Sequence, residues 1–377
     1  MHIVVLGGGY GGLRLIESLP RDYQITLIDK NPYHYLQTEA YEFLSGRKNI
    51  CDITFSLQSF CAYFPNVSFV QDVAVALEEK EVVGKKGRYP FDRLVIAVGA
   101  EDYFPPFIKG LKERSVALKE LPSAFGFKKA FLQRLFDEVA YQRPARIVVG
   151  GGGLSGVELA ADFMSVAREC DSQVGQCPMI EVILIEATES LLPGSSPFLQ
   201  RATQERLEKL CVQARLNSPI QEVDERFVYL EGERIAYDLF IFAGGIQAAA
   251  FVRNLAFKKN RLGQLIVDRY LRVDDHIYAI GDCAQIRNKK GEILPPTAQI
   301  AEQSAEYVAA HITGRRKDPF NGRVYGVFVA LGRNYAVGEI FGLKLKGRVA
   351  SWMKELITKI YAWGIKIKVN SGYKKRL

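Results

Sequence analysis

The chain has 377 residues, of which 48% are hydrophobic and 24% are charged, an ordinary globular composition that is long enough for two or three domains. No stretch approaches the roughly 18 uninterrupted apolar residues of a membrane-spanning helix. Met1 leads directly into an apolar strand, so we expect neither a span nor a cleaved signal. Six cysteines are scattered without a CxxC pair, which excludes a disulfide framework and favours a reducing, intracellular compartment.

The net charge of +8 comes from the C-terminal end of the chain. Residues 344–377 contain ten Lys or Arg and one acid, Glu355, whereas the rest of the chain has 40 basic and 41 acidic residues. The body of the protein is therefore electrically balanced, and basic residues dominate only one segment.

A complete unit of strand, glycine turn, helix and strand is predicted at the N-terminus: strand His2–Leu6, turn 7–12, helix Leu13–Leu19 and strand Gln24–Ile28. In such a turn Gly7 permits the tight bend, Gly9 lets a pyrophosphate approach the backbone, and Gly12 lets helix and strand pack closely. The second strand ends on Asp29, which is placed to accept a hydrogen bond from a ribose or adenosine hydroxyl. We interpret the unit as a dinucleotide site rather than as a purely structural turn.

The same pattern recurs further along the chain: strand Arg146–Val149, turn 151–156, helix Val157–Ala167 and strand Glu181–Ile185. Gly151, Gly153 and Gly156 take the three glycine positions, and the strand ends on Glu186. This acid follows the last glycine by thirty positions instead of about twenty, so a longer helix or an inserted loop is expected around 168–179. A carboxylate pairs with a 2′-hydroxyl and repels a 2′-phosphate, which favours NADH over NADPH.

Three further apolar strands end in glycine turns, at Gly99, at Gly244 and Gly245, and at Gly281 with Asp282. The first two are expected to carry the chain between domains. The third leads through Pro295 and Pro296 into a predicted helix, Thr297–Ile312.

These motifs resemble those of flavoproteins with two dinucleotide-binding domains, and most closely the type II, non-proton-pumping NADH:quinone oxidoreductases. The resemblance covers essentially the whole chain and rests on four segments, Gly153-Leu-Ser-Gly-Val-Glu158-Leu-Ala, Gly281-Asp-Cys-Ala, Ala298-Gln-Ile-Ala-Glu-Gln303 and Leu331-Gly-Arg-Asn-Tyr-Ala-Val-Gly338-Glu-Ile. It implies an α/β fold with two Rossmann-like domains, the second inserted in the first, and a C-terminal membrane-binding region. The implied boundaries are 1–106 and 246–312 for the FAD domain, 107–245 for the NADH domain, and 313–377 for the membrane-anchoring region.

The resemblance also implies the residues that hold each nucleotide. They are Gly7, Gly9, Gly12, Asp29, Gly99, Gly281, Asp282 and Ala298 for FAD, and Gly151, Gly153, Gly156, Glu186, Gly244 and Gly245 for NADH. Asp282 would accept hydrogen bonds from the ribityl chain. The N-terminus of the helix that starts near Thr297 would stabilise the reduced anionic flavin.

Three polar side chains are the implied catalytic residues. Gln299 and Gln303 are four residues apart and share a helical face, which lines the quinone pocket in the resembled family. The alternative is that both amides are simply solvated. Glu158 is the implied contact for nicotinamide or flavin and the implied proton relay, and the alternative is an acid favoured by the helix dipole. The segments 242–245 and 33–38 depart from the family pattern and leave the quinone type open.

In such a protein the flavin carries the reaction, so neither a protein nucleophile nor a metal is expected. Disulfide reductases place a CxxxxC pair shortly after the first motif, but residues 33–46 contain no cysteine. A sulfide:quinone oxidoreductase, which needs a redox pair of cysteines, is the first alternative. The turn 151–156 has no cysteine, none follows Cys283, and Cys170 and Cys177 are interpreted as ordinary thiols. An NADH-binding flavoprotein with a regulatory role is the second alternative.

The C-terminal segment has helical apolar spacing, at residues 349, 352, 353, 356, 357, 360 and 363. Both tryptophans, Trp352 and Trp363, lie on or beside this stripe, and lysines flank it. The pattern predicts an amphipathic helix that binds an anionic lipid surface, which would make the protein peripheral on the cytoplasmic face of the cell membrane. A helix that packs on the protein core or on a homodimer partner is the alternative, and no motif supports nucleic acid as a partner.

Overall fold

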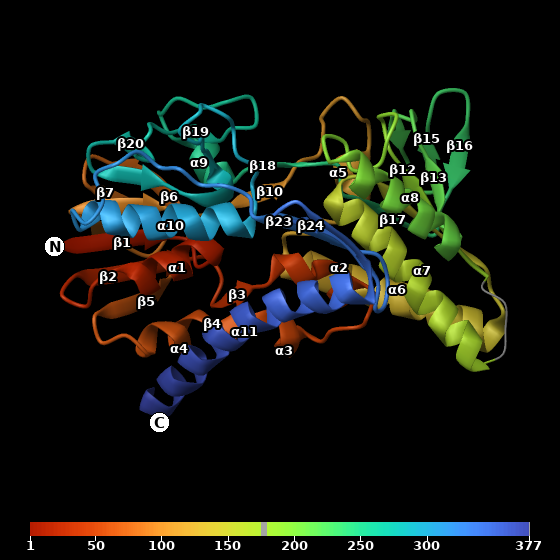
Figure 1. Ribbon diagram of the computed structural model, residues 1–377, viewed down its shortest axis with the longest axis horizontal. Coiled ribbons are helices and arrows are strands. Elements are labelled where there is room, and N and C mark those ends of the chain that lie inside the picture. The colour runs from red at the N-terminus through yellow and green to blue at the C-terminus, as the bar shows by residue number, and fades with distance from the viewer. Residues whose placement is uncertain (175–178, 377) are drawn as a thin grey trace.

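The computed structural model describes residues 1–174 and 179–376. Two mainly parallel β-sheets lie side by side, each with its own helices, and one long C-terminal helix runs below the first, with its N-terminal end near the second (Figure 1).

The first sheet has six strands in the order β20 (Arg272–Asp274), β21 (Ile277–Ala279), β9 (Arg93–Ile96), β1 (His2–Leu6), β2 (Gln24–Asp29) and β5 (Val67–Gln71). All neighbours except β20 and β21 are parallel. Ile3, Val4 and Val5 have no exposed area, as expected for a central strand that is covered on both faces. The helices α1 (Tyr10–Ser18) and α10 (Ala298–Ile312) pack against each other beside β1 (Figure 1).

The second sheet has four parallel strands in the order β13 (Gln213–Arg215), β12 (Ile180–Ile185), β11 (Ala145–Gly150) and β17 (Leu239–Phe242). Its helices are α5 (Leu111–Arg114), α6 (Leu121–Tyr141), α7 (Leu154–Val174) and α8 (Pro197–Leu210). The antiparallel strands β14 (Glu222–Val223), β15 (Phe227–Tyr229) and β16 (Arg234–Ala236) extend this unit.

The chain passes between the two units twice, through a pair of antiparallel strands. These are β10 (Ala100–Asp102) and β18 (Ile246–Ala248). The first sheet therefore takes strands from both sides of the second unit in the sequence, which confirms the predicted α/β class with one Rossmann-like unit inserted in the other.

Shorter elements complete the first unit. They are β3 (Tyr33–Tyr35), η1 (Gln37–Glu39), α2 (Ala40–Leu44), α3 (Ile50–Ile53), β4 (Thr54–Ser56), α4 (Leu57–Ala62), β6 (Ala74–Glu78), β7 (Glu81–Gly84), β8 (Arg88–Pro90), α9 (Ala250–Asn254), β19 (Leu265–Ile266), η2 (Gly281–Cys283) and β22 (Ala284–Gln285).

The C-terminal region consists of three antiparallel strands and a 29-residue helix. The strands are β23 (Gly326–Ala330), β24 (Ala336–Ile340) and β25 (Leu343–Gly347), and the helix is α11 (Arg348–Arg376). The inner face of α11 packs on α4 so closely that a Cβ on Gly372 would lie 1.8 Å from the carbonyl oxygen of Ser59. Ala350 and Ile365 are buried on this face. Within the described part of the chain, no helix is both long enough and apolar enough to cross a bilayer.

Helix ends differ from the predicted ones by one to seven residues. The helix α1 begins at Tyr10, inside the glycine turn, rather than at Leu13. The helix α7 begins at Leu154 and continues to Val174, so the extra length predicted around 168–179 is helical as far as Val174. Cys177 lies outside the described residues. The helix α10 begins one residue after Thr297, whose hydroxyl caps it by accepting from the Ile300 amide.

A buried ionic network joins the first unit to the second. Arg47 donates from Nε to Asp162 Oδ1 at 2.8 Å and from Nη2 to Glu169 Oε1 at 2.7 Å, both on α7. The Asp162 side chain is only 3% exposed, and Ser45 also donates to it. Burial raises the pKa of Asp162 to about 6, although the charge of Arg47 and the hydrogen bond of Ser45 oppose the shift.

Arg47→Ala should destabilise the protein because it leaves a buried carboxylate without its counter-charge, at a cost of roughly 3 kcal/mol at pH 8. A carboxyl group whose pKa is higher in the folded than in the unfolded chain, where it is about 3.9, loses its stabilising contribution as pH rises through the folded pKa. The loss in the variant should therefore be smaller at pH 5, where Asp162 is protonated. Urea unfolding at both pH values measures this.

The matched control is Arg114→Ala, which removes an exposed pair, Arg114 to Glu225 at 3.0 Å. It should change stability by less than about 0.5 kcal/mol. Equal effects of the two variants, or a loss in Arg47→Ala that does not depend on pH, would contradict the account of the buried network.

Candidate functional site

The first glycine turn has the geometry of a pyrophosphate site. Gly7 has a φ of +104°, and a Cβ on it would lie 2.4 Å from the carbonyl oxygen of Ala97. A Cβ on Gly12 would lie 1.9 Å from the Gly7 oxygen, whereas Gly9 faces open space. No side chain caps the N-terminus of α1. An FAD pyrophosphate therefore fits here, since the backbone is bare and the first helical N–H groups point at the opening.

Asp29 fixes this turn from the end of β2. Its Oδ2 accepts from the Gly8 amide at 2.6 Å and its Oδ1 accepts from the Asn31 amide at 2.7 Å. Burial raises the pKa of Asp29, and the two backbone donors oppose the shift. A carboxylate has about four acceptor positions, so both oxygens can still accept from the ribose hydroxyls.

The second turn repeats this geometry on the other sheet. Gly151 has a φ of +103°, a Cβ on Gly156 would lie 1.8 Å from the Gly151 oxygen, and Gly153 faces open space. Glu186, which follows β12 directly and is 7% exposed, accepts from the Gly152 amide at 2.6 Å and from the Thr188 amide at 2.8 Å. A second dinucleotide therefore fits at the carboxyl end of the second sheet.

Other glycines predicted as cofactor contacts lie at the same sheet ends. Gly151 approaches Gly244 so closely that an added Cβ would lie 2.8 Å from the Gly244 Cα, and Gly245 follows with a φ of +148°. In the first unit Gly99 follows β9 and faces open space. The carboxyl ends of parallel strands are where α/β proteins bind ligands.

Asp282 and Ala298 lie where η2 meets the start of α10. Gly281 has a φ of +66°, and its amide donates to Ser304 of α10. Asp282 Oδ2 is 3.4 Å from Lys119 Nζ, which also donates to Gln37 Oε1 at 3.0 Å. Sequence reasoning missed Lys119, because nothing in its local pattern distinguishes it from a solvated lysine.

Gln299 and Gln303 share one face of α10, as predicted, but both amides already have partners. Gln299 donates to the Gly326 oxygen at 2.8 Å and accepts from the Tyr325 amide at 3.1 Å. Gln303 donates to the Arg323 oxygen at 2.9 Å and accepts from the Arg323 amide at 3.1 Å. The two side chains brace the segment that leads into β23, a role that neither of the two readings of the sequence included.

Glu158 lies at a junction of three parts of the chain. Its Oε1 accepts from the Ala330 amide of β23 at 2.9 Å and lies 2.5 Å from Lys354 Nζ of α11. Lys354 also donates to the Tyr41 hydroxyl at 3.1 Å. The two charged side chains are 13% and 16% exposed. Lys354 was missed as a site residue because its position on the helical wheel, off the apolar stripe, is that of a solvated lysine.

A second acid and base cluster lies next to this junction. Glu39 is 3% exposed and pairs with Lys48, which also binds Glu42 at 2.7 Å. Burial raises the pKa of Glu39 to about 7, and the charges of Lys48 and Lys354 oppose the shift. A carboxyl group of this pKa exchanges a proton near neutral pH.

The first glycine turn is also in contact with α11 through a buried histidine. His34 Nδ1 is 3.0 Å from the Gly8 oxygen, and its Nε2 is 3.1 Å from the Tyr361 hydroxyl of α11. The rings of His34, Tyr10 and Tyr361 are in mutual contact, with centroids 4.9 to 5.9 Å apart. Burial lowers the pKa of His34 to about 4, so the ring is neutral at pH 7.

Among the described residues, the two buried cysteines are poorly suited to thiol chemistry. Cys61 and Cys283 are buried, and burial raises the pKa of each thiol to about 12. Cys283 donates to the carbonyl oxygens of Ile96 and Ile280. Such thiols are poor nucleophiles at neutral pH. In the described part of the chain, no group of three His, Cys, Asp or Glu side chains is placed to hold a metal ion.

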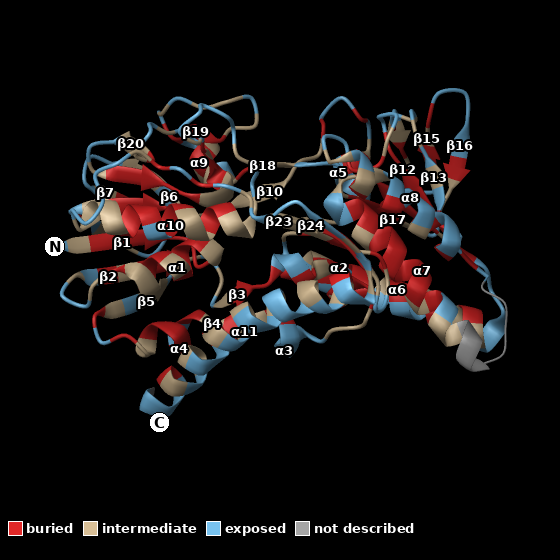
Figure 2. Ribbon diagram, in the orientation of Figure 1, coloured by how far each residue is buried: buried red, intermediate tan, exposed pale blue. Residues whose placement is uncertain are grey.

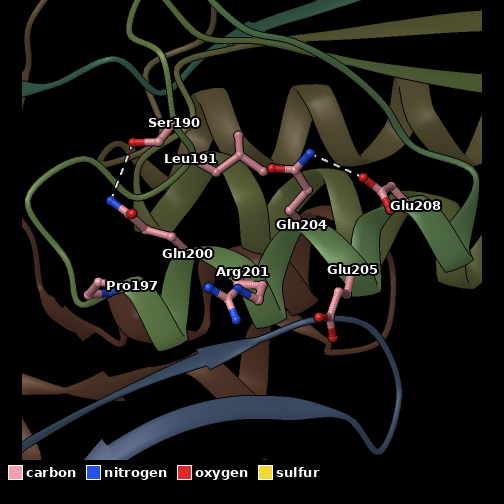
Figure 3. Close-up of a pocket in the computed structure, with 8 residues that line it drawn as sticks. All are labelled: Ser190, Leu191, Pro197, Gln200, Arg201, Gln204, Glu205 and Glu208. Atoms are coloured by element: carbon pink, nitrogen blue, oxygen red, sulfur yellow. Dashed lines mark hydrogen bonds between the residues drawn. The ribbon is translucent and has the colours of Figure 1, made fainter.

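A polar depression runs along the outer face of α8 (Figure 3) and reaches Leu191, whose side chain lies against Gly152 of the second turn. Gln200 donates to Ser190 at 3.3 Å and Gln204 donates to Glu208 at 3.1 Å. Both amides are therefore hydrogen-bonded to other residues that line the depression. It contains none of the residues that the sequence predicted for the site.

Paired glycine turns on two parallel sheets define the class of α/β proteins with two dinucleotide-binding units. The chain belongs to the pyridine nucleotide-disulphide oxidoreductase family, whose pattern matches residues 1–305. It is also similar to the type II NADH:quinone oxidoreductase of Staphylococcus aureus strain NCTC 8325. The two are 28% identical over 379 residues, which cover 94% of this chain and 93% of that protein.

Two solved structures share the fold. NDH2 from Plasmodium falciparum, in complex with NADH, is 20% identical with a TM-score of 0.86, and the match covers 99% of this chain and 97% of that one. The sulfide:quinone oxidoreductase from Aquifex aeolicus is 20% identical with a TM-score of 0.82, over 97% of this chain and 92% of that one.

Gln299→Ala should loosen the segment before β23, because it removes the donor to Gly326 and the acceptor for Tyr325. Amide hydrogen exchange at residues 323–326 should accelerate by roughly tenfold, as the loss of one or two hydrogen bonds implies. Gln204→Ala on the exposed face of α8 is the matched control and should leave that segment unchanged. Unaltered exchange in Gln299→Ala would show that the amide does not brace it.

Proposed function

We propose that this protein is a type II NADH:quinone oxidoreductase that takes a hydride from NADH onto FAD and passes two electrons to a quinone without pumping protons. The observation that carries the proposal is the presence of two glycine turns of equal geometry, each fixed by a strand-end acid. End-to-end similarity to a protein of this name supports it.

Each segment of the chain is assigned one ligand. We propose that 1–106 with 246–312 bind FAD, that 107–245 bind NADH, and that 313–377 form the membrane-anchoring region. FAD is then held by the first turn with Asp29 and by Asp282, and NADH by the second turn with Glu186. The choice of NADH over NADPH is supported by the buried carboxylate of Glu186, which would repel a 2′-phosphate.

Bound FAD supplies the acceptor for the hydride and the donor of two electrons. Reduction of a quinone to a quinol by one hydride equivalent also consumes one proton. We propose that Glu158 and Lys354, joined at 2.5 Å and largely buried, hold and transfer this proton. Gln299 and Gln303 then act by positioning the segment before β23 rather than by direct contact with the quinone.

Sulfide:quinone oxidation is the principal competing function because a protein of that activity shares the fold. It needs two cysteines that exchange with sulfur. The turn 151–156 contains no cysteine, and the thiol of Cys283 is buried and protonated. A regulatory role would show instead as flavin reduction by NADH without rapid reoxidation by quinone.

Anaerobic stopped-flow absorbance tests the proposal. NADH should bleach the bound flavin and a soluble quinone should restore it, whereas sulfide should do neither. Glu158→Gln should slow reoxidation by roughly 10²-fold, the usual range for loss of a proton-transfer group, and Glu205→Gln, an exposed acid on α8, should not. Bleaching by sulfide alone would exclude the proposed activity and favour the competing one.

We further propose that the outer face of α11 lies on an anionic membrane, at its cytoplasmic face. Trp352, Ile360 and Trp363 on this face are 62%, 61% and 67% exposed, and ten Lys or Arg in 344–377 lie in and before the helix. The pale blue outer side of α11 in Figure 2 follows the length of the helix. Exposed apolar residues in such a stripe indicate a binding surface. A homodimer through this face is the alternative.

Trp352→Ser with Trp363→Ser should weaken binding to vesicles that contain phosphatidylglycerol by roughly tenfold or more, because each tryptophan buries a large apolar surface. Point variants are preferable to deleting the helix, whose inner face is part of the core. Phe107→Ser with Tyr141→Ser removes two aromatic residues that are 79% and 60% exposed and is the control. Undiminished vesicle binding together with loss of a dimer in solution would favour the alternative.

A further inference from the structure

Four arginines from four separate segments line one depression between the second unit and the C-terminal region. Arg168 comes from α7, Arg206 from α8, Arg333 from the turn between β23 and β24, and Arg348 is the first residue of α11. Glu169 is the one carboxylate among the described residues that line it. The depression therefore has a strong excess of positive charge.

The arginines are held by contacts that leave most of their donors unused. Arg206 lies over the Tyr335 ring, with its guanidinium carbon 4.4 Å from the centroid, and donates from Nε to the Leu331 oxygen at 3.1 Å. Arg168 donates to the Lys209 oxygen at 2.7 Å. A guanidinium has five N–H donors in a planar fork, so each of these two groups can still bind an anion with two parallel hydrogen bonds.

The single carboxylate in the depression is already neutralised. Glu169 accepts from Arg47 at 2.7 Å and is 3.3 Å from Arg333 Nη1. In the described part of the chain, no carboxylate forms an ion pair with Arg168, Arg206 or Arg348. Burial and the charge of Arg168 lower the pKa of Arg206, which is the direction expected for a cation that lacks an anionic partner.

We propose that this depression binds a phosphate-bearing anion. A guanidinium fork binds phosphate oxygens with two parallel hydrogen bonds, and forks from several segments can contact the several oxygens of one phosphate. The site is separate from both glycine turns and from the junction of Glu158 and Lys354.

A lipid headgroup is one source of the phosphate, and a soluble phosphate is the other. Arg348 directly precedes Val349 and lies one helical turn before Trp352, and these two residues are 59% and 62% exposed on the outer face of α11. If that face lies on a membrane, as the proposed function has it, the depression opens at the level of the headgroups. This choice of source rests on the proposed function, whereas the anion site itself does not.

Two probes test the site on the full-length protein. Inorganic phosphate should raise the thermal unfolding midpoint, since it binds the folded state alone. Flotation should show tighter binding to phosphatidylcholine vesicles that contain phosphatidylglycerol than to vesicles without it. Arg168→Gln with Arg348→Gln should weaken phosphate binding by roughly tenfold or more, as expected for the loss of charge-assisted hydrogen bonds.

The matched control is Arg201→Gln with Arg226→Gln, which removes the same charge from exposed positions outside the depression. Arg206→Lys is the sharper variant, because it keeps the charge, loses the planar fork and should still lose phosphate binding. If the depression variants alone lose both phosphate binding and vesicle binding, the ligand is a lipid phosphate. If they lose phosphate binding but keep vesicle binding, the ligand is a soluble anion. Equal losses in the control pair would overturn the site. NADH:quinone activity with a soluble quinone is measured separately, so its failure and that of the anion site are distinguishable.

Discussion

In both nucleotide-binding units a carboxylate at a strand end accepts a hydrogen bond from the amide that follows the first glycine of the turn. The distance is 2.6 Å in each case, Asp29 to Gly8 and Glu186 to Gly152. A charged acceptor makes such a bond stronger than a neutral one. It holds the turn against the neighbouring strand, so the first N–H groups of the following helix point at one place. The position of any bound pyrophosphate, and with it the reach of the rest of the nucleotide, depends on this bond.

Two such sites are useful for electron transfer only if their separation is fixed. The network of Arg47 with Asp162 and Glu169 provides one fixed link, since it joins the loop after α2 to α7. The helix α11 provides another, because Lys354 reaches Glu158 of the second unit while Tyr361 reaches His34 of the first. Both links use groups with little exposure, so breaking either would leave polar atoms buried without partners.

The sequence predicted the structure best where only one backbone conformation is compatible with the local residues. Gly7 and Gly151 have the positive φ that their turns require, and the adjoining strands end within one residue of their predicted ends. It was least informative for contacts between distant segments. Lys354 lies 196 residues from Glu158, and no periodicity links the two. The braces made by Gln299 and Gln303 were missed for the same reason, since their partners are backbone atoms of a segment without a regular pattern.

The helix α11 shows why an amphipathic pattern alone does not separate an anchor from a structural helix. Its apolar residues lie on two faces: Ala350 and Ile365 are buried against the protein, whereas Trp352 and Trp363 are exposed. The polar residues between them are not uniformly solvated either, since Lys354 is 16% and Lys359 72% exposed. A membrane on the outer face would therefore act on the same rigid element that carries Lys354 to Glu158.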